Sequence, residues 1–158
     1  MRYLYILLIT ISVHSQNIII GDSQTPFIDA QTSKASRVSQ LWKSGIGVSE
    51  LTSMVNNYPI SPTVRNVIIT IGTNDQFQGS VSNLQQALKR KFTNAKFYII
   101  QGSWGWGNNK HISISQVYRY YSQWNLFATV ISTPIGPGNP HQQKASYILI
   151  GQSLDKIL

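Results

Sequence analysis

Three side chains that lie far apart in the sequence could together carry out acyl transfer. Ser23 follows an apolar run at 17–20, Asn74 follows a second apolar run at 67–71, and His141 lies near the C-terminus. A serine hydroxyl is a weak nucleophile, so it needs a base and hydrogen-bond donors that hold the negative oxygen of a tetrahedral intermediate. Histidine can be the base, and the asparagine amide can be one donor. The set therefore predicts an acyl-transfer site.

Strand-like and helix-like segments alternate around these residues. Alternation at this spacing predicts βαβ units and a parallel sheet covered by helices on both faces. We therefore expect a three-layer α/β/α domain with a parallel five-stranded sheet. The expected strands are 17–20, 41–43, 66–71, 96–100 and 127–131, and the expected helices are 34–40, 50–57, 80–91, 114–124 and 145–158.

The sheet should bring the chemical residues to one rim, because sites in such folds form beyond the carboxyl ends of the strands. Ser23, Asn74 and His141 each follow an expected strand, and so does a loop at 102–109 that is rich in glycine and tryptophan. His111 also falls in an expected loop and is the alternative base. The position of His141 just before the last helix favours His141.

Length, charge and cysteine content restrict the class of protein. A chain of 158 residues fits one domain, here 16–158. There is no cysteine, so disulfides and thiolate metal sites are excluded, and no His/Asp/Glu cluster or nucleotide-binding loop predicts a metal or cofactor. The net charge is +8, but the basic residues are scattered apart from 89–91, at an expected helix end. We therefore expect no nucleic-acid partner.

The first fifteen residues read as a secretory signal. Arg2 precedes an apolar stretch at 3–13, and Ser15 stands where cleavage is expected. The apolar stretch is too short to span a bilayer. We expect 1–15 to be removed, leaving a secreted, periplasmic or envelope-facing protein with no stable membrane insertion. The alternative is that 4–13 is a buried element of the domain, in which case the protein is soluble and intracellular or virion-associated.

Four short blocks, in this order, resemble the SGNH (GDSL-like) hydrolases. They are GDSQ at 21–24, the glycine turn at 45–47, GTND at 72–75 and Pro-His at 140–141. The resemblance covers the whole of 16–158. It implies a flavodoxin-like α/β/α fold and ester hydrolysis.

The same resemblance implies a role for each residue that matches a block. Ser23 is the nucleophile, and its backbone N–H is one oxyanion donor. The Asn74 side chain and a glycine N–H of the second block are the other donors, and His141 is the base.

The segment before His141 departs from the family pattern. The family has an aspartate three residues before its histidine, whereas this chain has Gly138, with Asn139 as the nearest polar residue. One interpretation is that a backbone carbonyl holds His141, which leaves a Ser-His dyad. The other is that Asp22, Asp29 or Asp75 reaches the site as a remote carboxylate. Asp75 is also expected to fix its own loop.

The glycine turn departs from the pattern as well. An ungapped match places Val48 where the family has glycine, and a shift of one residue places Gly47 there. We expect Gly47 to be the donor, because a β-branched residue resists the positive φ angles that glycine adopts. Gly45 is the alternative.

The substrate is expected to be a small acyl ester on a carbohydrate. Trp104 and Trp106 lie between glycines in the expected rim loop, where their flat faces could contact sugar rings. An alternative is a lipid or thioester hydrolase with the same site. A further alternative is a non-catalytic glycan-binding module on the same scaffold, which the missing aspartate would permit.

Overall fold

A computed structural model describes residues 16–107 and 111–158 of the chain and shows a five-stranded parallel sheet. The strand order is β2-β1-β3-β4-β5. This order is the flavodoxin-like one, with β1 and β3 as neighbours where the direction of winding reverses. The strands are β1 (Gln16–Gly21), β2 (Ser36–Trp42), β3 (Val64–Thr70), β4 (Lys96–Ile100) and β5 (Thr129–Ile131).

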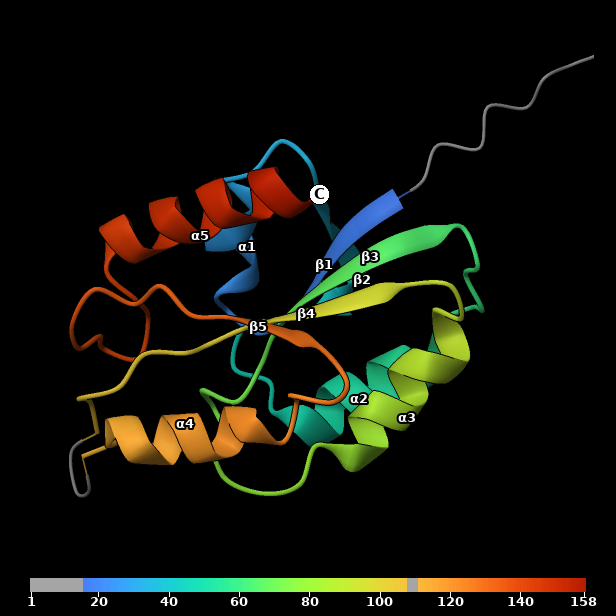
Figure 1. Ribbon diagram of the computed structural model, residues 1–158. Helices are drawn as coiled ribbons and strands as arrows, with labels where there is room; N and C mark the ends of the chain where they lie inside the picture. The colour runs from blue at the N-terminus through green and yellow to red at the C-terminus, as the bar shows by residue number, and fades with distance from the viewer. Residues whose placement is uncertain (1–15, 108–110) are drawn as a thin grey trace, which may run out of the picture.

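Helices cover both faces of the sheet and make three layers. In Figure 1, α1 and α5 lie above the sheet, while α2, α3 and α4 lie below it. The expected α/β/α architecture with a parallel five-stranded sheet is therefore confirmed. The helices are α1 (Thr25–Asp29), α2 (Val48–Asn57), α3 (Ser82–Lys91), α4 (Ile114–Ser122) and α5 (Lys144–Ile157).

The central strand β3 is buried on both faces. Ile69 belongs to the larger apolar cluster, shared with α2, α3 and α4, and its neighbour Ile68 belongs to the smaller cluster, shared with α1 and α5. Successive side chains of a strand point to opposite faces, so a strand between two helical layers needs an uninterrupted apolar sequence. This explains the β-branched run that marked the strand in the sequence.

The expected helix at 34–40 is wrong. Strand β2 begins at Ser36, and Leu41 is its only buried residue. The strand lies at the edge of the sheet, where it pairs with β1 alone. An edge strand with one buried residue has no apolar periodicity, so its polar sequence did not resemble a strand. The short helix α1 was also not expected.

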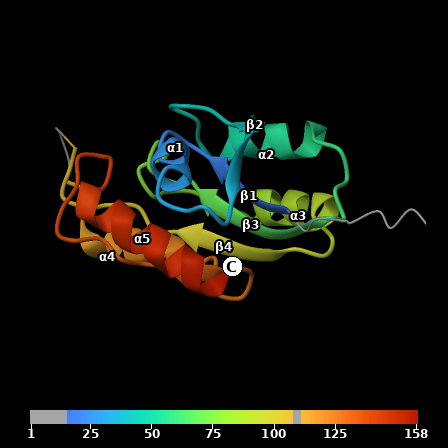
Figure 2. The ribbon, with the colours of Figure 1, turned by 90° about the horizontal axis from the view of Figure 1, so that it is seen from above.

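The strands end in register, and this aligns the loops that carry the site. Gly21 of β1 pairs with Thr70 of β3, Thr70 pairs with Ile100 of β4, and Ile100 pairs with Ile131 of β5. Figure 2 shows the arrowheads of β3 and β4 pointing to the end of the sheet where α1 and the start of α5 lie. The segments that follow these strands therefore emerge along one rim.

The expected signal segment 1–15 lies outside the described residues. Among the residues that are described, no helix has the length and apolar character needed to cross a membrane.

Candidate active site

Ser23 lies in the turn between β1 and α1. The backbone N–H of Asp22 donates to the Thr70 carbonyl at 2.8 Å, which continues the pairing with β3 for one more residue. The Thr25 N–H then donates to the Asp22 carbonyl at 3.1 Å, and Pro26 occupies the first turn of α1. Proline suits this position because the first N–H groups of a helix have no intrahelical acceptor. Ser23 is thereby held half-buried at the rim.

The structure brings His141 to Ser23. The Ser23 Oγ and the His141 Nε2 are 2.8 Å apart, although 118 positions separate the two residues. With the proton of the neutral imidazole on Nδ1, the serine hydroxyl donates to Nε2, which is the arrangement for general-base activation of a nucleophile. The competing histidine, His111, is exposed and precedes α4.

Asn74 lies beside the glycine turn of the second block. Its Nδ2 donates to the Ile46 carbonyl at 2.8 Å. The side-chain amide carries two N–H donors, so the second remains for a substrate oxygen. The neighbouring Asp75 accepts a hydrogen bond from the Val48 N–H at 2.8 Å through Oδ2, which fixes the start of α2. The second and third blocks are therefore joined by two hydrogen bonds.

The two glycines of the second block have different surroundings. A Cβ on Gly47 would collide with the Asp75 carboxylate, whereas a Cβ on Gly45 would meet open space, and Gly45 requires glycine only because its φ is +82°. Gly47 is thus packed against the segment that carries Asn74. Val48, the alternative in the ungapped match, uses its N–H to bind Asp75. The φ angle of Gly47 is −103°, so the positive φ that we expected at the donor is wrong. Its packing against Asp75 is what supports Gly47 as the backbone donor.

The loop before His141 is hydrogen-bonded to Ser103, which follows β4. The Ser103 Oγ donates to the Pro140 carbonyl at 2.7 Å, and Ser103 is only 1% exposed. The Asn139 N–H donates to the His141 carbonyl at 2.9 Å. A Cβ on Gly138 would collide with both the Ser103 Oγ and the His141 carbonyl oxygen. This loop conformation therefore has no room for the aspartate that the family carries at this position.

A buried amide, that of Gln24, links the three segments of the site. Its Nε2 donates to the Thr73 Oγ1 at 2.8 Å, and its Oε1 lies 3.3 Å from the Tyr147 hydroxyl, which donates to it. The Tyr147 hydroxyl in turn accepts from the Gln142 N–H at 3.2 Å. Gln24, Thr73 and Gln142 are the chain neighbours of Ser23, Asn74 and His141.

Sequence reasoning assigned no role to Gln24, Ser103 or Tyr147. Gln24 was visible as the last residue of the first block, but its partners are 49 and 123 positions away. Only the folded chain shows that it joins the segments.

Comparison with known proteins gives structural matches only. No family model matches the chain, and no curated protein matches it in sequence. Solved structures do match, and many of them are lipolytic G-D-S-L proteins and esterases. A member of the lipolytic protein G-D-S-L family from Veillonella parvula DSM 2008 has a TM-score of 0.58 and 17% identity, with 90% of this chain and 97% of that chain covered.

Two further solved structures illustrate the range of proteins that share the architecture. The native M. smegmatis aryl esterase has a TM-score of 0.58 and 14% identity, covering 90% of this chain and 97% of that one. A carbohydrate esterase family 2 enzyme with a carbohydrate-binding domain, from Corynascus thermopiles, has a TM-score of 0.59 and 15% identity. The match covers 91% of this chain and 65% of that chain. The chain therefore shares the α/β/α fold of these lipolytic G-D-S-L proteins and esterases.

Asp22 is completely buried next to the turn that carries Ser23. Its Oδ1 accepts from the Gln24 N–H at 3.0 Å. Burial raises the pKa of the Asp22 carboxyl from 3.8 to about 7, because removal from water disfavours the charged form, and the hydrogen bond from the Gln24 N–H offsets only part of this effect. A buried, partly protonated carboxyl therefore lies next to Ser23 in sequence.

The two tryptophans of the rim loop are half-buried against the larger apolar cluster. The Trp106 indole N–H donates to the Ser103 carbonyl at 3.0 Å, and its ring meets the Phe77 ring edge-on at 6.1 Å. Trp104 accepts a hydrogen bond at its carbonyl from the Gly138 N–H at 2.9 Å. Both residues thus hold the loops around His141, and much of their ring surface is used in packing. Residues 108–110 of this loop lie outside the described part of the chain.

Proposed function

We propose that the protein is a serine esterase that forms an acyl-enzyme on Ser23. The contact of 2.8 Å between the Ser23 Oγ and the His141 Nε2 carries this proposal. Such a pair activates a hydroxyl for attack on a carbonyl carbon. The SGNH fold supports the same activity, since the matching structures include aryl esterases and acylhydrolases.

The proposed reaction has two halves. In the first, His141 takes the Ser23 proton as Oγ bonds to the ester carbonyl carbon, and the resulting oxyanion accepts hydrogen bonds from the Ser23 N–H, the Gly47 N–H and the Asn74 amide. The C–O bond to the alcohol then breaks, and the imidazolium of His141 returns the proton to the departing oxygen. In the second half, water gives a proton to His141 as its oxygen bonds to the acyl carbon. The bond between that carbon and the Ser23 Oγ then breaks, and the imidazolium of His141 returns the proton to Oγ, which releases the acid and restores the Ser23 hydroxyl.

A hydrogen-bonded frame holds the base where the family pattern has an aspartate. The Ser103 bond to the Pro140 carbonyl and the Tyr147 bond to the Gln142 N–H restrain the backbone on both sides of His141. Preorganisation of this kind raises the rate because the reacting atoms already stand in the productive geometry. We therefore propose a Ser-His dyad held by backbone contacts.

One candidate for the substrate is a small acyl ester of a carbohydrate. It is favoured by structural likeness to a carbohydrate esterase family 2 enzyme and to the catalytic domain of the Streptococcus pneumoniae peptidoglycan O-acetyltransferase OatA, which matches with a TM-score of 0.59. Turnover of acetylated oligosaccharides, compared with simple alkyl acetates at equal concentration, tests this substrate class.

Labelling by a fluorophosphonate probe tests the nucleophile directly. The wild-type protein should gain one probe mass on Ser23 and hydrolyse p-nitrophenyl acetate, whereas Ser23→Ala should do neither and should keep its circular dichroism spectrum. His141→Ala should lose both activities, and the matched variant His111→Ala should retain them. Absence of labelling in the wild-type protein, together with measurable sugar binding, would instead identify a glycan-binding module.

A series of p-nitrophenyl esters separates the proposed activity from that of a lipid hydrolase. Highest turnover with the acetyl ester supports a small acyl group, and highest turnover with medium-length chains supports a lipid or thioester substrate.

A further inference from the structure

We propose that an apolar groove beside His141 binds the alcohol part of the ester, and that the preferred alcohol carries an alkyl chain or an aromatic ring. This inference rests on the esterase function proposed above and favours an apolar alcohol over the carbohydrate candidate. The groove lies between α1 and the start of α5, which pack against each other at the carboxyl end of the sheet (Figure 2). Its volume is about 480 Å³. That is within the range of roughly 300–1,000 Å³ found for small-molecule sites.

The walls of the groove are mostly carbon. Pro26, Phe27 and Ala30 of the α1 segment form one wall, and His141 and Tyr147 contribute to the other. Removing apolar surface from water is favourable by roughly 25 cal/mol per Å². The groove is therefore suited to an apolar ligand.

Phe27 connects the groove to the reacting atoms. Its ring centroid lies 5.0 Å from that of His141, and its ring stacks on Tyr147 at 5.1 Å with an interplanar angle of 15°. Even so, 43% of its surface remains exposed. When the alcohol oxygen of an ester lies next to the His141 Nε2, the exposed Phe27 ring can pack against the apolar group that this oxygen carries.

Proton transfer decides which part of the ester enters the groove. The departing alcohol oxygen receives its proton from the His141 Nε2, so it must come within hydrogen-bond distance of that atom. The carbonyl oxygen must instead point to the donors at Gly47 and Asn74. The groove is lined by His141 but by neither Gly47 nor Asn74. A group attached to the departing oxygen therefore extends towards the groove.

Two ester series can distinguish the alcohol side from the acyl side. Acetate esters of ethanol, butanol and 2-phenylethanol keep the acyl group constant and have leaving alcohols of similar acidity. Ethyl esters of acetic, butyric and hexanoic acid keep the alcohol constant. We expect kcat/KM to rise about fourfold for each methylene that the groove removes from water, and so about fifteenfold from ethyl to butyl acetate.

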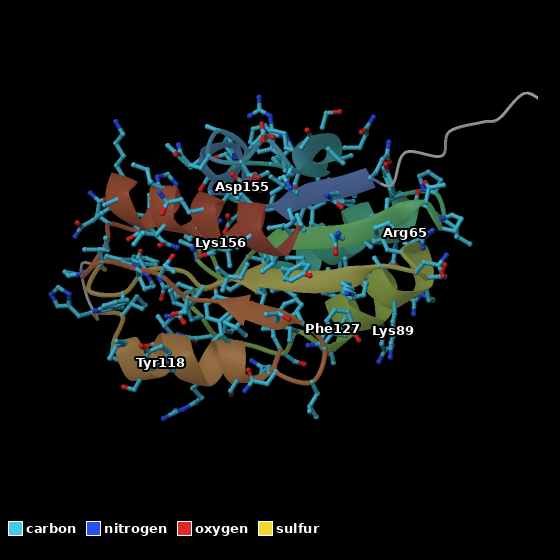
Figure 3. All side chains as sticks on the ribbon, turned by 45° about the horizontal axis from the view of Figure 1, so that its top comes forward. Arg65, Lys89, Tyr118, Phe127, Asp155 and Lys156 are labelled. Atoms are coloured by element: carbon cyan, nitrogen blue, oxygen red, sulfur yellow. The ribbon has the colours of Figure 1, made fainter. Side chains whose placement is uncertain are left out.

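Filling the groove should remove the preference for large alcohols. Ala30 has φ −71° and ψ −11°, which any L-residue can adopt, and its side chain is exposed. A larger side chain can therefore replace it. Ala30→Trp should lower the ratio of kcat/KM for 2-phenylethyl acetate to that for ethyl acetate by about tenfold. The matched control is Tyr118→Ala, which removes an aromatic ring that is 52% exposed on the outer face of α4, and it should keep the wild-type ratio (Figure 3).

Phe27→Ala is a second variant, which removes part of one wall instead of filling the groove. It should also lower the ratio of kcat/KM for 2-phenylethyl acetate to that for ethyl acetate. Calorimetry of 2-phenylethanol binding to Ser23→Ala tests the groove in a protein that cannot turn over an ester. The double variant Ser23→Ala/Ala30→Trp should bind 2-phenylethanol more weakly.

Several outcomes would overturn the proposal. The first is a kcat/KM that does not change with the size of the alcohol. The second is a kcat/KM that rises with the length of the acyl chain and loses this rise in Ala30→Trp. The third is faster turnover of an acetylated oligosaccharide than of butyl acetate. If no ester is hydrolysed and Ser23 is not labelled, the esterase function fails. The calorimetric result then decides whether the groove binds an apolar alcohol.

Discussion

Tyr147 and Gln24 are hydrogen-bonded across 123 positions of the chain, with the tyrosine hydroxyl 3.3 Å from the glutamine Oε1. The same hydroxyl accepts from the Gln142 N–H, so it connects the turn that carries Ser23 to the loop that carries His141. Tyr147 is buried, and burial raises its pKa to about 12, so the hydroxyl keeps its proton and remains a donor at neutral pH.

Removing this hydroxyl should affect the rate more than substrate binding. Tyr147→Phe leaves the Gln142 N–H and the Gln24 Oε1 without this partner and allows the two segments to shift. We expect kcat for ethyl acetate to fall about tenfold with little change in KM, because small displacements of reacting groups are costly. The free energy of unfolding should fall by about 1 kcal/mol.

Tyr98→Phe is the matched control for this change. Tyr98 is a buried tyrosine of β4 in the same apolar cluster. Its variant should keep the wild-type kcat, and an equal loss of kcat in both variants would show that the effect of Tyr147→Phe is general loosening of the core.

Ser103 should act on the rate through the position of His141. Ser103→Ala removes the 2.7 Å hydrogen bond to the Pro140 carbonyl and frees the loop next to the base. We expect kcat to fall about tenfold, with KM within about twofold of the wild-type value. Ser61→Ala removes a similar bond, from a serine hydroxyl to the Pro59 carbonyl, at a distance from the site, and should leave kcat unchanged. Equal kcat in Ser103→Ala and wild type would exclude the positioning role.

Restoring the family aspartate should not improve the enzyme. In Gly138→Asp the new Cβ would collide with the Ser103 Oγ and the His141 carbonyl oxygen, so the loop must move before the carboxylate can reach the imidazole. We expect lower kcat and a lower melting temperature than in the wild-type protein. A rise in kcat, measured with p-nitrophenyl acetate, would show that the loop adapts and that a carboxylate was missing.

Asn74 should contribute mainly to the transition state. One N–H of its amide holds the Ile46 carbonyl, and the mechanism proposed above assigns the other to the oxyanion. Asn74→Ala should lower kcat by about 10²- to 10³-fold, as does loss of one side-chain donor in other oxyanion holes. A kcat within threefold of wild type, in a protein with an unchanged circular dichroism spectrum, would remove Asn74 from the site.

Asp22 should make stability depend on pH. Because its pKa is about 7 in the folded protein and 3.8 in a model peptide, the folded state retains a proton that the unfolded state has lost at intermediate pH. Its contribution to the free energy of unfolding is therefore largest below about pH 4, decreases as the pH rises, and is lost above about pH 7.

Asp22→Asn cannot titrate, so its free energy of unfolding should decrease less than that of the wild-type protein between about pH 4 and pH 7. Urea unfolding at half-unit intervals of pH measures both curves. Parallel curves would show that the Asp22 carboxyl has an ordinary pKa.

The sequence was sufficient for the layers of the fold, and it predicted that Ser23, Asn74 and a histidine follow strands that end on one rim. The C-terminal parts of strands β1, β3 and β4 are buried, so their sequences there are mostly apolar, and this local pattern can be read without a structure. Parallel strands that end in register must deliver the following residues to one rim. Ser23, Asn74 and His141 could therefore be grouped from the positions of the runs that precede them.

Other features depended on contacts between distant segments. Strand β2 lies at the edge with one buried residue, so its sequence is not restricted to apolar residues, and its first five residues were interpreted as part of a helix. The choice between His141 and His111 depended on which loop reaches Ser23. The packing of Trp104 and Trp106 depended on the neighbouring core.

The local sequence determines which segments become strands, because each strand must match the burial on its own two faces. The frame built by Gln24, Tyr147 and Ser103, and the closed loop at Gly138, arise from side chains whose partners come from other parts of the chain. No local pattern encodes such pairs, so only the tertiary structure decided how the base is held without an aspartate at position 138.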